Sequence, residues 1–286
     1  MATIIDGKEL ARKTRESLKI DCQNLKEKGI VPKLAVIMVG DNPASKVYVR
    51  NKSKACEDVG IEYEEFLLDE NTKQDELIAL IHKLNNRDDI TGILLQSPIP
   101  AGLDINEAFR EISYKKDVDG FHPINVGKLS IGQDTFISCT PYGVIKMFEE
   151  YNIDLTGKNV VIIGRSNIVG KPLIQCCLNK NATVTVCHSK TQNIEEYTKR
   201  ADVVIVAIGK AKFLKADMVK DGAVIIDVGI NRGEDGKLCG DVDFEKVSKK
   251  ASYITPVPGG VGPMTIAMLM NNVIKAAITF GDTSKK

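Results

Sequence analysis

The stretch that decides the fold reads Lys158-Asn-Val-Val-Ile-Ile-Gly-Arg-Ser-Asn-Ile-Val-Gly-Lys-Pro172. In it an apolar strand enters a turn bracketed by Gly164 and Gly170, and a helix opens behind the turn. The start of a helix offers unpaired backbone N–H groups and a positive dipole end, and glycines let a phosphate approach the backbone closely. The stretch therefore predicts a dinucleotide-binding turn, although Ser166 replaces the usual middle glycine and Arg165 adds a positive charge.

The next apolar strand, Ala182–Cys187, indicates which dinucleotide to expect. It ends at His188-Ser189-Lys190, without the acidic residue that binds the ribose hydroxyls of NAD. Arg165, Ser166 and Ser189 instead supply a guanidinium and two hydroxyls, a set suited to a phosphate dianion. The sequence thus favours NADP over NAD. The alternative is an ordinary strand–turn–helix corner with a solvent-facing arginine.

The composition narrows the class of partner. A net charge of +1, from 39 basic and 38 acidic residues, provides no basic field for nucleic acid or an anionic membrane. The seven cysteines are odd in number and lack C-x-x-C spacing, which is typical of a reducing compartment, and the N-terminus has no apolar signal core. We therefore expect a cytoplasmic protein that binds small molecules. No apolar run is expected to approach membrane-spanning length, and three scattered histidines predict no metal site.

The first half of the chain predicts alternating strands and helices. After a short Ile4-Ile5 strand, a helix capped by Asp6 and ended by Gly29 is expected. The further strands are 34–39, 61–68 and 92–96, and the further helices are 43–59, which starts at Pro43 and stops at Gly60, and a Thr72-capped helix to Leu84. This β-α-β-α-β order is typical of a mostly parallel sheet. The segment 115–138 that follows is predicted to be rich in loops, and long loops in compact domains often carry function.

The second half predicts another doubly wound sheet. Its expected strands are 160–163, 183–187, 203–207 and 224–228, and a final helix, 264–277, is expected to pack back on the first domain. The predicted fold is therefore α/β with two domains, an N-terminal substrate domain and a C-terminal Rossmann-like NADP-binding domain. We assign residues 1–139 with a return helix 264–286 to the first domain, and residues 140–263 to the second.

Tyr48 and Lys52 form the first candidate for chemistry. Four residues apart on a predicted helix, they share one face, where a phenol and an amine meet the same ligand. A lysine in a partly desolvated site has a lowered pKa, which suits it to proton transfer. Helix surfaces carry many such pairs, so the pair alone is weak evidence. In short-chain dehydrogenases the Tyr-x-x-x-Lys pair follows the glycine turn, whereas here it precedes it.

Three further segments offer polar groups to a ligand. Gln96 ends an apolar strand, where the carboxyl edge of a parallel sheet binds ligands, although it is also a plausible turn residue. Asp117 and Asp119 lie in one loop able to present a carboxylate to the N–H groups of a flat heterocycle; the alternative is a solvated acidic turn. The glycines of Pro258–Pro263 allow close backbone approach, and the segment also serves as a rigid lead-in to the last helix.

Together these segments closely resemble the bifunctional methylenetetrahydrofolate dehydrogenase/methenyltetrahydrofolate cyclohydrolase family, known in bacteria as FolD. The resemblance runs nearly end to end, and its order and spacing make coincidence very improbable. It rests on the stretches Tyr48–Lys54, Gly92–Pro100, Lys116–Phe121, Gly164–Pro172 and Pro256–Thr265. One departure is Ser97, where the family commonly has leucine, and which is expected to affect packing beneath the folate and not the proton chemistry.

The resemblance implies an activity in two steps. The enzyme would oxidise 5,10-methylenetetrahydrofolate with NADP+ to the methenyl form and hydrolyse that form to 10-formyltetrahydrofolate in the same cleft. It also implies homodimers formed through the nucleotide domains. No third activity, the ligation of formate to tetrahydrofolate, is expected from this chain.

The resemblance also implies a role for each matching residue. Lys52 would be the acid/base, Gln96 would hold its amine, Tyr48 would align the folate and Asp119 would anchor the pterin. The remaining substrate contacts would be Pro258, Gly259 and Gly260, and the NADP contacts would be Gly164, Arg165, Ser166, Ser189 and Ile230.

Two other functions stay open on the sequence alone. One is a two-domain amino-acid or shikimate-type dehydrogenase, which also places its substrate domain first; the Lys116–Phe121 and Pro256–Thr265 segments argue against it. The other is a nucleotide-sensing or interaction protein that keeps the fold without turnover. The argument against it is the joint presence of Tyr48, Lys52, Gln96 and Asp119.

Overall fold

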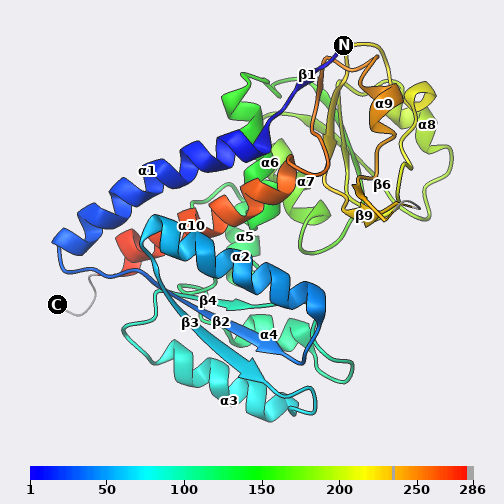
Figure 1. Ribbon diagram of the computed structural model, residues 1–286. Helices are drawn as coiled ribbons and strands as arrows, with labels where there is room; N and C mark the ends of the chain where they lie inside the picture. Colours follow the sequence, from blue (N-terminus) through cyan, green and yellow to red (C-terminus); the bar gives the residue numbers. More distant parts are fainter. Residues whose placement is uncertain (234–235, 282–286) are drawn as a thin grey trace. The chain divides into compact units, whose positions relative to one another are not determined.

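The computed structural model describes residues 1–233 and 236–281, and its chain forms two compact units (Figure 1). Unit 1 consists of Met1–Ala11 and Thr140–Thr265, and unit 2 of Arg12–Cys139 and Ile266–Lys286. The first domain was predicted to begin at residue 1, but the first eleven residues cluster with unit 1 because strand β1 (Thr3–Ile4) pairs with β11 (Tyr253–Ile254) there. The end of the predicted return helix, 282–286, lies outside the described residues.

Unit 2 is built on a parallel sheet in the order β3-β2-β4, which confirms the predicted β-α-β-α-β pattern. Figure 1 shows α2 on one face of this sheet and α3 and α4 on the other. The buried side chains of β2 and β4 pack against α3 and α4 in one hydrophobic cluster. The bounds are β2 Lys33–Val39, β3 Glu62–Leu68, β4 Gly92–Leu95, α2 Pro43–Val59, α3 Gln74–Asn85 and α4 Ile105–Glu111.

Local chemistry sets the ends of α2. The Asn42 side chain accepts hydrogen bonds from the first backbone N–H groups, Pro43 fits the first turn, and Gly60 ends the helix with a left-handed φ of 89°. Both ends agree with the prediction.

One local prediction in unit 2 was wrong, and another was incomplete. Thr72 does not cap α3; that position is Lys73, whose backbone N–H donates to the Glu76 carboxylate at 2.9 Å. The loop-rich segment 115–138 contains a helix, α5 (Pro123–Ser130), because Pro123 stands in its first turn and His122 Nδ1 accepts the backbone N–H of Ile124 at 3.1 Å.

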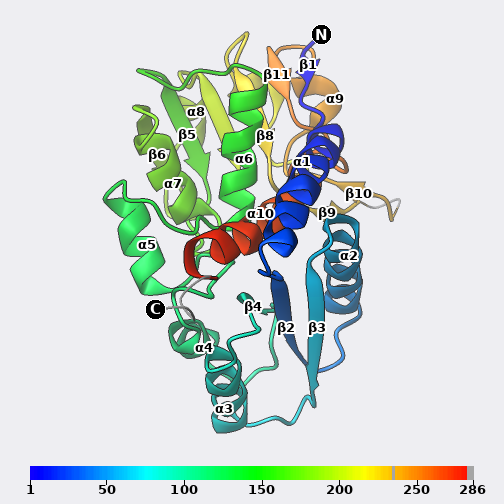
Figure 2. The same cartoon turned by 90° about the vertical axis from the view of Figure 1, so that its left-hand side faces the viewer.

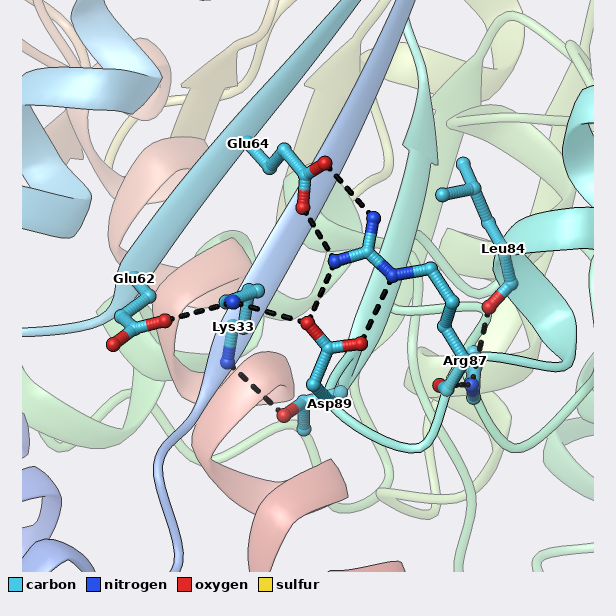
Figure 3. A network of polar contacts seen from close by, with 8 residues as sticks. Lys33, Glu62, Glu64, Leu84, Arg87 and Asp89 are labelled. Carbon is cyan, nitrogen blue, oxygen red and sulfur yellow. Dashed lines mark hydrogen bonds and ion pairs between the residues drawn. The ribbon is translucent and has the colours of Figure 1, made fainter.

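The end of this sheet where β2 and β3 begin is held by an ionic network (Figure 3). Arg87 donates two hydrogen bonds of 2.8 Å to the two carboxylate oxygens of Glu64 and also pairs with Asp89 at 2.6 Å. Lys33, the first residue of β2, binds Asp89 and Glu62 at 3.0 and 2.9 Å. These cations hold the pKa of Asp89 and of Glu64 below the usual range. The network fixes one end of the sheet, and the opposite end carries Gln96.

Unit 1 contains a parallel sheet in the order β1-β11-β8-β7-β5-β6, and the four strands predicted from the sequence are all present in it. Figure 2 shows α6 and α7 on one face of the sheet and α8 and α9 on the other. The short N-terminal strand predicted at Ile4-Ile5 is present as β1, but β11 and the β9–β10 pair were not predicted from the sequence. The bounds are β5 Asn159–Ile163, β6 Thr183–Cys187, β7 Val203–Val206, β8 Val224–Asp227, β9 Asn231–Arg232, β10 Leu238–Cys239, α6 Cys139–Glu150, α7 Gly170–Leu178, α8 Ile194–Thr198 and α9 Phe244–Val247.

The strand order of unit 1 creates a place for a ligand. From β5 the chain moves to β6 on one side, then crosses to β7 on the other side of β5. In an open α/β sheet the crevice at such a reversal, at the carboxyl ends of the strands, is where ligands bind. The turn Gly164–Gly170 follows β5 at that point.

Helix α10 (Val261–Phe280) extends beyond the predicted 264–277 and packs in unit 2 through its second half. There Met270 contacts Cys56 with a sulfur–sulfur distance of 3.6 Å, and Asn272 donates to the Val118 carbonyl at 2.8 Å. By length and composition α10 is apolar enough to cross a membrane, so the expectation that no apolar run approaches that length was wrong. However, 61% of the apolar stretch is buried inside the protein, as in a core helix.

Candidate active site

The hydrogen bond between Lys52 and Gln96 is the centre of the site in unit 2. Lys52 Nζ, on α2, donates to Gln96 Oε1 at 2.9 Å. Gln96 directly follows β4 and is only 6% exposed; its backbone N–H continues the sheet by donating to the Ile37 carbonyl at 2.8 Å. Its side-chain amide donates to the main-chain carbonyl of Ser97 at 2.5 Å. Gln96 therefore presents its oxygen to Lys52, and its side-chain amide binds the backbone of Ser97 and not the Ser97 side chain.

Asp119 shares the electrostatic environment of Lys52. Burial lowers the pKa of Lys52, and the charge of Asp119 opposes that change. Burial raises the pKa of Asp119, and the charge of Lys52 opposes it in turn. The structure thus brings together three of the predicted residues, Lys52, Gln96 and Asp119. Burial moves the pKa of the Lys52 amine and the pKa of the Asp119 carboxyl group toward each other.

Tyr48 lies one helical turn before Lys52 on the same helix. Its side chain is 44% exposed, and within the described residues its hydroxyl has no hydrogen-bond partner. The phenol is therefore free to contact a ligand beside the Lys52 amine.

The two acids of the 117–119 loop differ in what they bind. Asp117 is 2% exposed and accepts hydrogen bonds from the backbone N–H groups of Phe121 and His122 at 3.1 and 2.8 Å and from the Asn125 amide at 2.8 Å. Burial raises its pKa to about 6. Asp117 thus organises the loop internally, whereas Asp119 is the carboxylate left to meet a ligand.

The glycine turn of unit 1 is fixed by a close backbone approach and by hydrogen bonds within the turn. Gly164 adopts a φ of 121°, and a Cβ there would lie 2.3 Å from the Ala207 carbonyl oxygen. Ser166 Oγ accepts the backbone N–H groups of Val169 and Gly170 at 3.1 and 3.3 Å, which closes the turn onto α7. The turn therefore holds its conformation through its own contacts.

The donors of this turn fit a phosphate. Arg165 and Ser166 are exposed, as is Ser189 beyond the end of β6. In the described part of the chain, the backbone N–H groups of Arg165 and Asn167 and the Arg165 guanidinium have no protein partner. A dinucleotide with an additional phosphate thus finds open backbone donors at the turn and a fixed cation beside them.

Comparison with known proteins identifies the family. The model "Tetrahydrofolate dehydrogenase/cyclohydrolase, catalytic domain" matches residues 5–119, and the corresponding "NAD(P)-binding domain" model matches residues 138–280. The chain belongs to the tetrahydrofolate dehydrogenase/cyclohydrolase family. This membership decides against the amino-acid and shikimate-type dehydrogenases.

Individual members of the tetrahydrofolate dehydrogenase/cyclohydrolase family align over almost the whole chain. Bifunctional protein FolD from Acetivibrio thermocellus is 58% identical and covers 96% of this chain and 97% of its own. The crystal structure of FolD from Campylobacter jejuni is 56% identical, with a TM-score of 0.96 over 97% of this chain and 99% of that one. The Trypanosoma brucei enzyme, solved with NADP and an inhibitor, is 34% identical, with a TM-score of 0.92 and 97% of each chain covered.

The remaining residues predicted to contact ligands lie in unit 1. Ile230 is 49% exposed, beside Gly262. The segment 258–260 forms a tight lead-in to α10: Gly259 accepts the backbone N–H of Lys8 at 2.9 Å, and a Cβ on Gly260 would lie 2.4 Å from the Pro256 carbonyl oxygen. Pro258 is exposed beside them. The predicted lead-in is thus observed, and a ligand contact there stays a prediction.

Sequence analysis missed two residues that support Asp119. The Cys139 thiol donates toward Asp119 Oδ1 at 3.5 Å. Asn272, fully buried on α10, donates to the main-chain carbonyls of Val118 and Ile137 at 2.8 and 2.9 Å. The position of Asn272, a polar residue within an apolar helix, could have marked it as a buried hydrogen-bonding residue, but nothing in the sequence indicates its partners.

Other sites are not evident in the described residues. They contain no group of three or more His, Cys, Asp or Glu side chains placed to hold a metal ion, and each of the seven cysteines is free. A surface cavity of about 380 Å³ in unit 1 includes none of the predicted site residues; it is lined by Ile145 and residues 148–149, 152–156 and 179–181.

The two loop acids give a matched test. Replacing Asp117 by Asn leaves backbone N–H donors facing an amide, so we expect a loss of about 1–3 kcal/mol in the free energy of unfolding. Asp119→Asn should cost clearly less, because the Asp119 carboxylate accepts only the weak Cys139 thiol among described hydrogen-bond donors. Urea titrations of both variants measure the difference. Equal losses would contradict the division between a structural and a ligand-binding acid.

Proposed function

We propose that this chain oxidises 5,10-methylenetetrahydrofolate with NADP+ to 5,10-methenyltetrahydrofolate and hydrolyses that product to 10-formyltetrahydrofolate. The observation that carries the proposal is the desolvated amine of Lys52, held by Gln96 at 2.9 Å beside the carboxyl group of Asp119. Relatives named as bifunctional, at up to 58% identity over nearly the full length, support both steps.

In the oxidation the protein mainly positions its ligands. NADP+, when bound, accepts a hydride from the folate. The carbon that loses the hydride lies between two nitrogens, which share the resulting positive charge, so no strong acid or base is needed at that carbon. Asp119 would accept hydrogen bonds from the pterin amino and ring N–H groups, and Tyr48 would align the ring system.

The substrate and cofactor contacts in unit 1 complete the assignment. The backbone of Pro258, Gly259 and Gly260 would approach the substrate. The turn that begins at Gly164, with the exposed donors of Arg165 and Ser166, would hold the phosphates of NADP together with Ser189, and Ile230 would supply an apolar contact. The support is the exposure of Arg165, Ser166 and Ser189 beyond the carboxyl ends of β5 and β6, and the exposure of Ile230 and Pro258.

Hydrolysis requires proton transfer, which we assign to Lys52. Its neutral amine would take a proton from the water that attacks the amidinium carbon. The resulting ammonium would return a proton to N5 as the bond between N5 and that carbon breaks, which leaves the formyl group on N10. The net reaction consumes one water and releases one proton. A desolvated lysine suits this role because its lowered pKa raises the fraction of neutral amine near neutral pH.

Lys52→Met tests this role. The substitution removes the amine and keeps an apolar stem, so we expect hydrolysis of methenyltetrahydrofolate to fall by at least about 10²-fold, the usual contribution of a general acid/base, while NADPH binding persists. Lys54→Met, an exposed lysine two residues further on, is the matched control and should retain hydrolysis. Hydrolysis by Lys52→Met at the wild-type rate would refute the assignment.

Arg165→Ala tests the choice of cofactor. The guanidinium would bind the additional phosphate of NADP, which NAD lacks, so its loss should weaken NADP binding by about 1.5–3 kcal/mol, the value of a hydrogen bond to a charged group. NAD binding should change little. The dissociation constants of the variant for the two reduced cofactors, measured by fluorescence titration, give the answer. Equal losses for both would remove Arg165 from the phosphate site.

We also propose a cytoplasmic homodimer that forms through unit 1. The open edge of the six-stranded sheet, β6, is a short strand whose middle residues are only half-buried, and exposed strand edges invite pairing. Light scattering of the purified protein should give twice the chain mass of 31.3 kDa; a monomer at micromolar concentration would contradict the dimer. Recovery in the membrane fraction of lysed cells would contradict the location.

A further inference from the structure

A single buried carboxylate fixes the loop that follows β7 in unit 1. Asp241 is fully buried, and its Oδ2 accepts the backbone N–H groups of Ile208 and Gly209 at 2.8 and 3.0 Å. Its Oδ1 accepts the backbone N–H of Lys210 at 2.7 Å. Three consecutive N–H groups on one carboxylate leave the loop little freedom, because each is a charge-assisted hydrogen bond in a buried place.

Asp241 also holds the segment that follows β8. Its Oδ1 accepts the side-chain amide of Asn231 at 2.9 Å, and Asn231 adjoins Ile230. Asp241 is itself held, because Asp227, the last residue of β8, accepts its backbone N–H at 2.9 Å. A Cβ on Gly229 would lie 2.1 Å from the Asp241 carboxyl carbon, so only glycine permits this approach.

The two held segments lie at the ligand crevice of the sheet. The order in which strands join the sheet reverses at β5, with β6 on one side of it and β7 on the other. The crevice therefore has the glycine turn after β5 as one side and the loop after β7 as the other. The two sides touch, since a Cβ on Gly164 would lie 2.3 Å from the Ala207 carbonyl oxygen. Arg165 and Ser189 are the proposed contacts of the adenosine phosphate, and Ser189 follows β6, on the other side of β5 from β7. The side of the crevice formed by the segments after β7 and β8 therefore remains for the nicotinamide end of NADP.

We propose that Asp241 is a positioning residue for the nicotinamide half of NADP. It is buried and does not touch the cofactor; it acts through the backbone of residues 208–210 and through Asn231 on Ile230. The inference rests on the proposed function, in that NADP binds at the Gly164–Gly170 turn. A role in aligning the reacting ring, and not in holding the phosphates, predicts that loss of Asp241 impairs hydride transfer more than cofactor affinity.

Three variants test the proposal. Asp241→Asn places an amide against the backbone N–H donors, and Asn231→Ala removes only the link between Asp241 and the Ile230 segment. Asp243→Asn is the matched control, an acid two residues away that is 8% exposed and pairs with Lys246 at 3.4 Å, without a described contact to either loop. We expect dehydrogenase kcat to fall roughly tenfold or more in Asp241→Asn and by a smaller factor in Asn231→Ala, because small displacements of reacting groups are costly.

Two measurements separate this role from a general loss of structure. The dissociation constant for NADPH, from fluorescence titration, should change less than about threefold in Asp241→Asn and Asn231→Ala, because the phosphate contacts are intact. In the cofactor-free protein, hydrogen exchange of the peptide that contains Ile208, Gly209 and Lys210 should be faster in Asp241→Asn than in wild type and in Asp243→Asn. A raised deuterium isotope effect on kcat with the deuterated methylene substrate would further support the proposal.

The contrary results are equally definite. Equal losses of kcat and NADPH affinity, unchanged exchange at residues 208–210, or the same behaviour in Asp243→Asn would overturn the proposal. If Asp241→Asn does not fold, Asn231→Ala decides, and a wild-type kcat in that variant overturns it. Failure of the wild-type protein to bind NADPH would overturn the proposed function itself. Suppose that the wild-type protein binds NADPH and that Arg165→Ala weakens this binding. If the Asp241 and Asn231 variants then fail to lose more kcat than NADPH affinity, only this inference is overturned.

Discussion

The hydrogen bond from Lys52 to Gln96 is the contact on which the rest of the site depends. A desolvated amine is useful for proton transfer only if its position is fixed. Gln96 fixes the Lys52 amine because the backbone of Gln96 is held by the sheet and its side-chain amide is held by the Ser97 carbonyl. The charge of Asp119 limits the cost of burying an ammonium in this place. Asp117, through three hydrogen bonds of its own, keeps the Asp119 loop in place.

The two units place their candidate ligand-binding groups in the same way. Functional groups follow the carboxyl ends of parallel strands: Gln96 follows β4, and the Gly164 turn follows β5. In each unit a buried acid, Asp117 or Asp241, accepts successive backbone N–H groups and so shapes a loop without facing the ligand. The hydrogen-bonding capacity of such an acid is taken up by main-chain donors. Asp117 therefore has a structural role, although Asp119, two residues further on, is left to bind a ligand.

The sequence predicted what local patterns encode. The buried strands were found to within one or two residues, and the chemistry of Asn42-Pro43 and Gly60 set both ends of α2. The α3 cap was misplaced by one residue, because Lys73 caps through its backbone and not through a side-chain oxygen. The supporting residues stayed hidden because their partners are distant in the chain: Asn272 binds a carbonyl 154 residues away, and Asp241 binds a loop about 30 residues away.

The central claim is that one chain catalyses both an NADP-dependent oxidation and a hydrolysis. The most direct measurement is a time course of the purified protein with 5,10-methylenetetrahydrofolate and NADP+, repeated with NAD+, that follows reduced cofactor, methenyl and 10-formyl products separately. The account predicts NADPH together with 10-formyltetrahydrofolate, and slower turnover with NAD+. Methenyl product that accumulates without hydrolysis beyond its spontaneous rate would contradict the role of Lys52, and absence of NADPH would contradict the account as a whole.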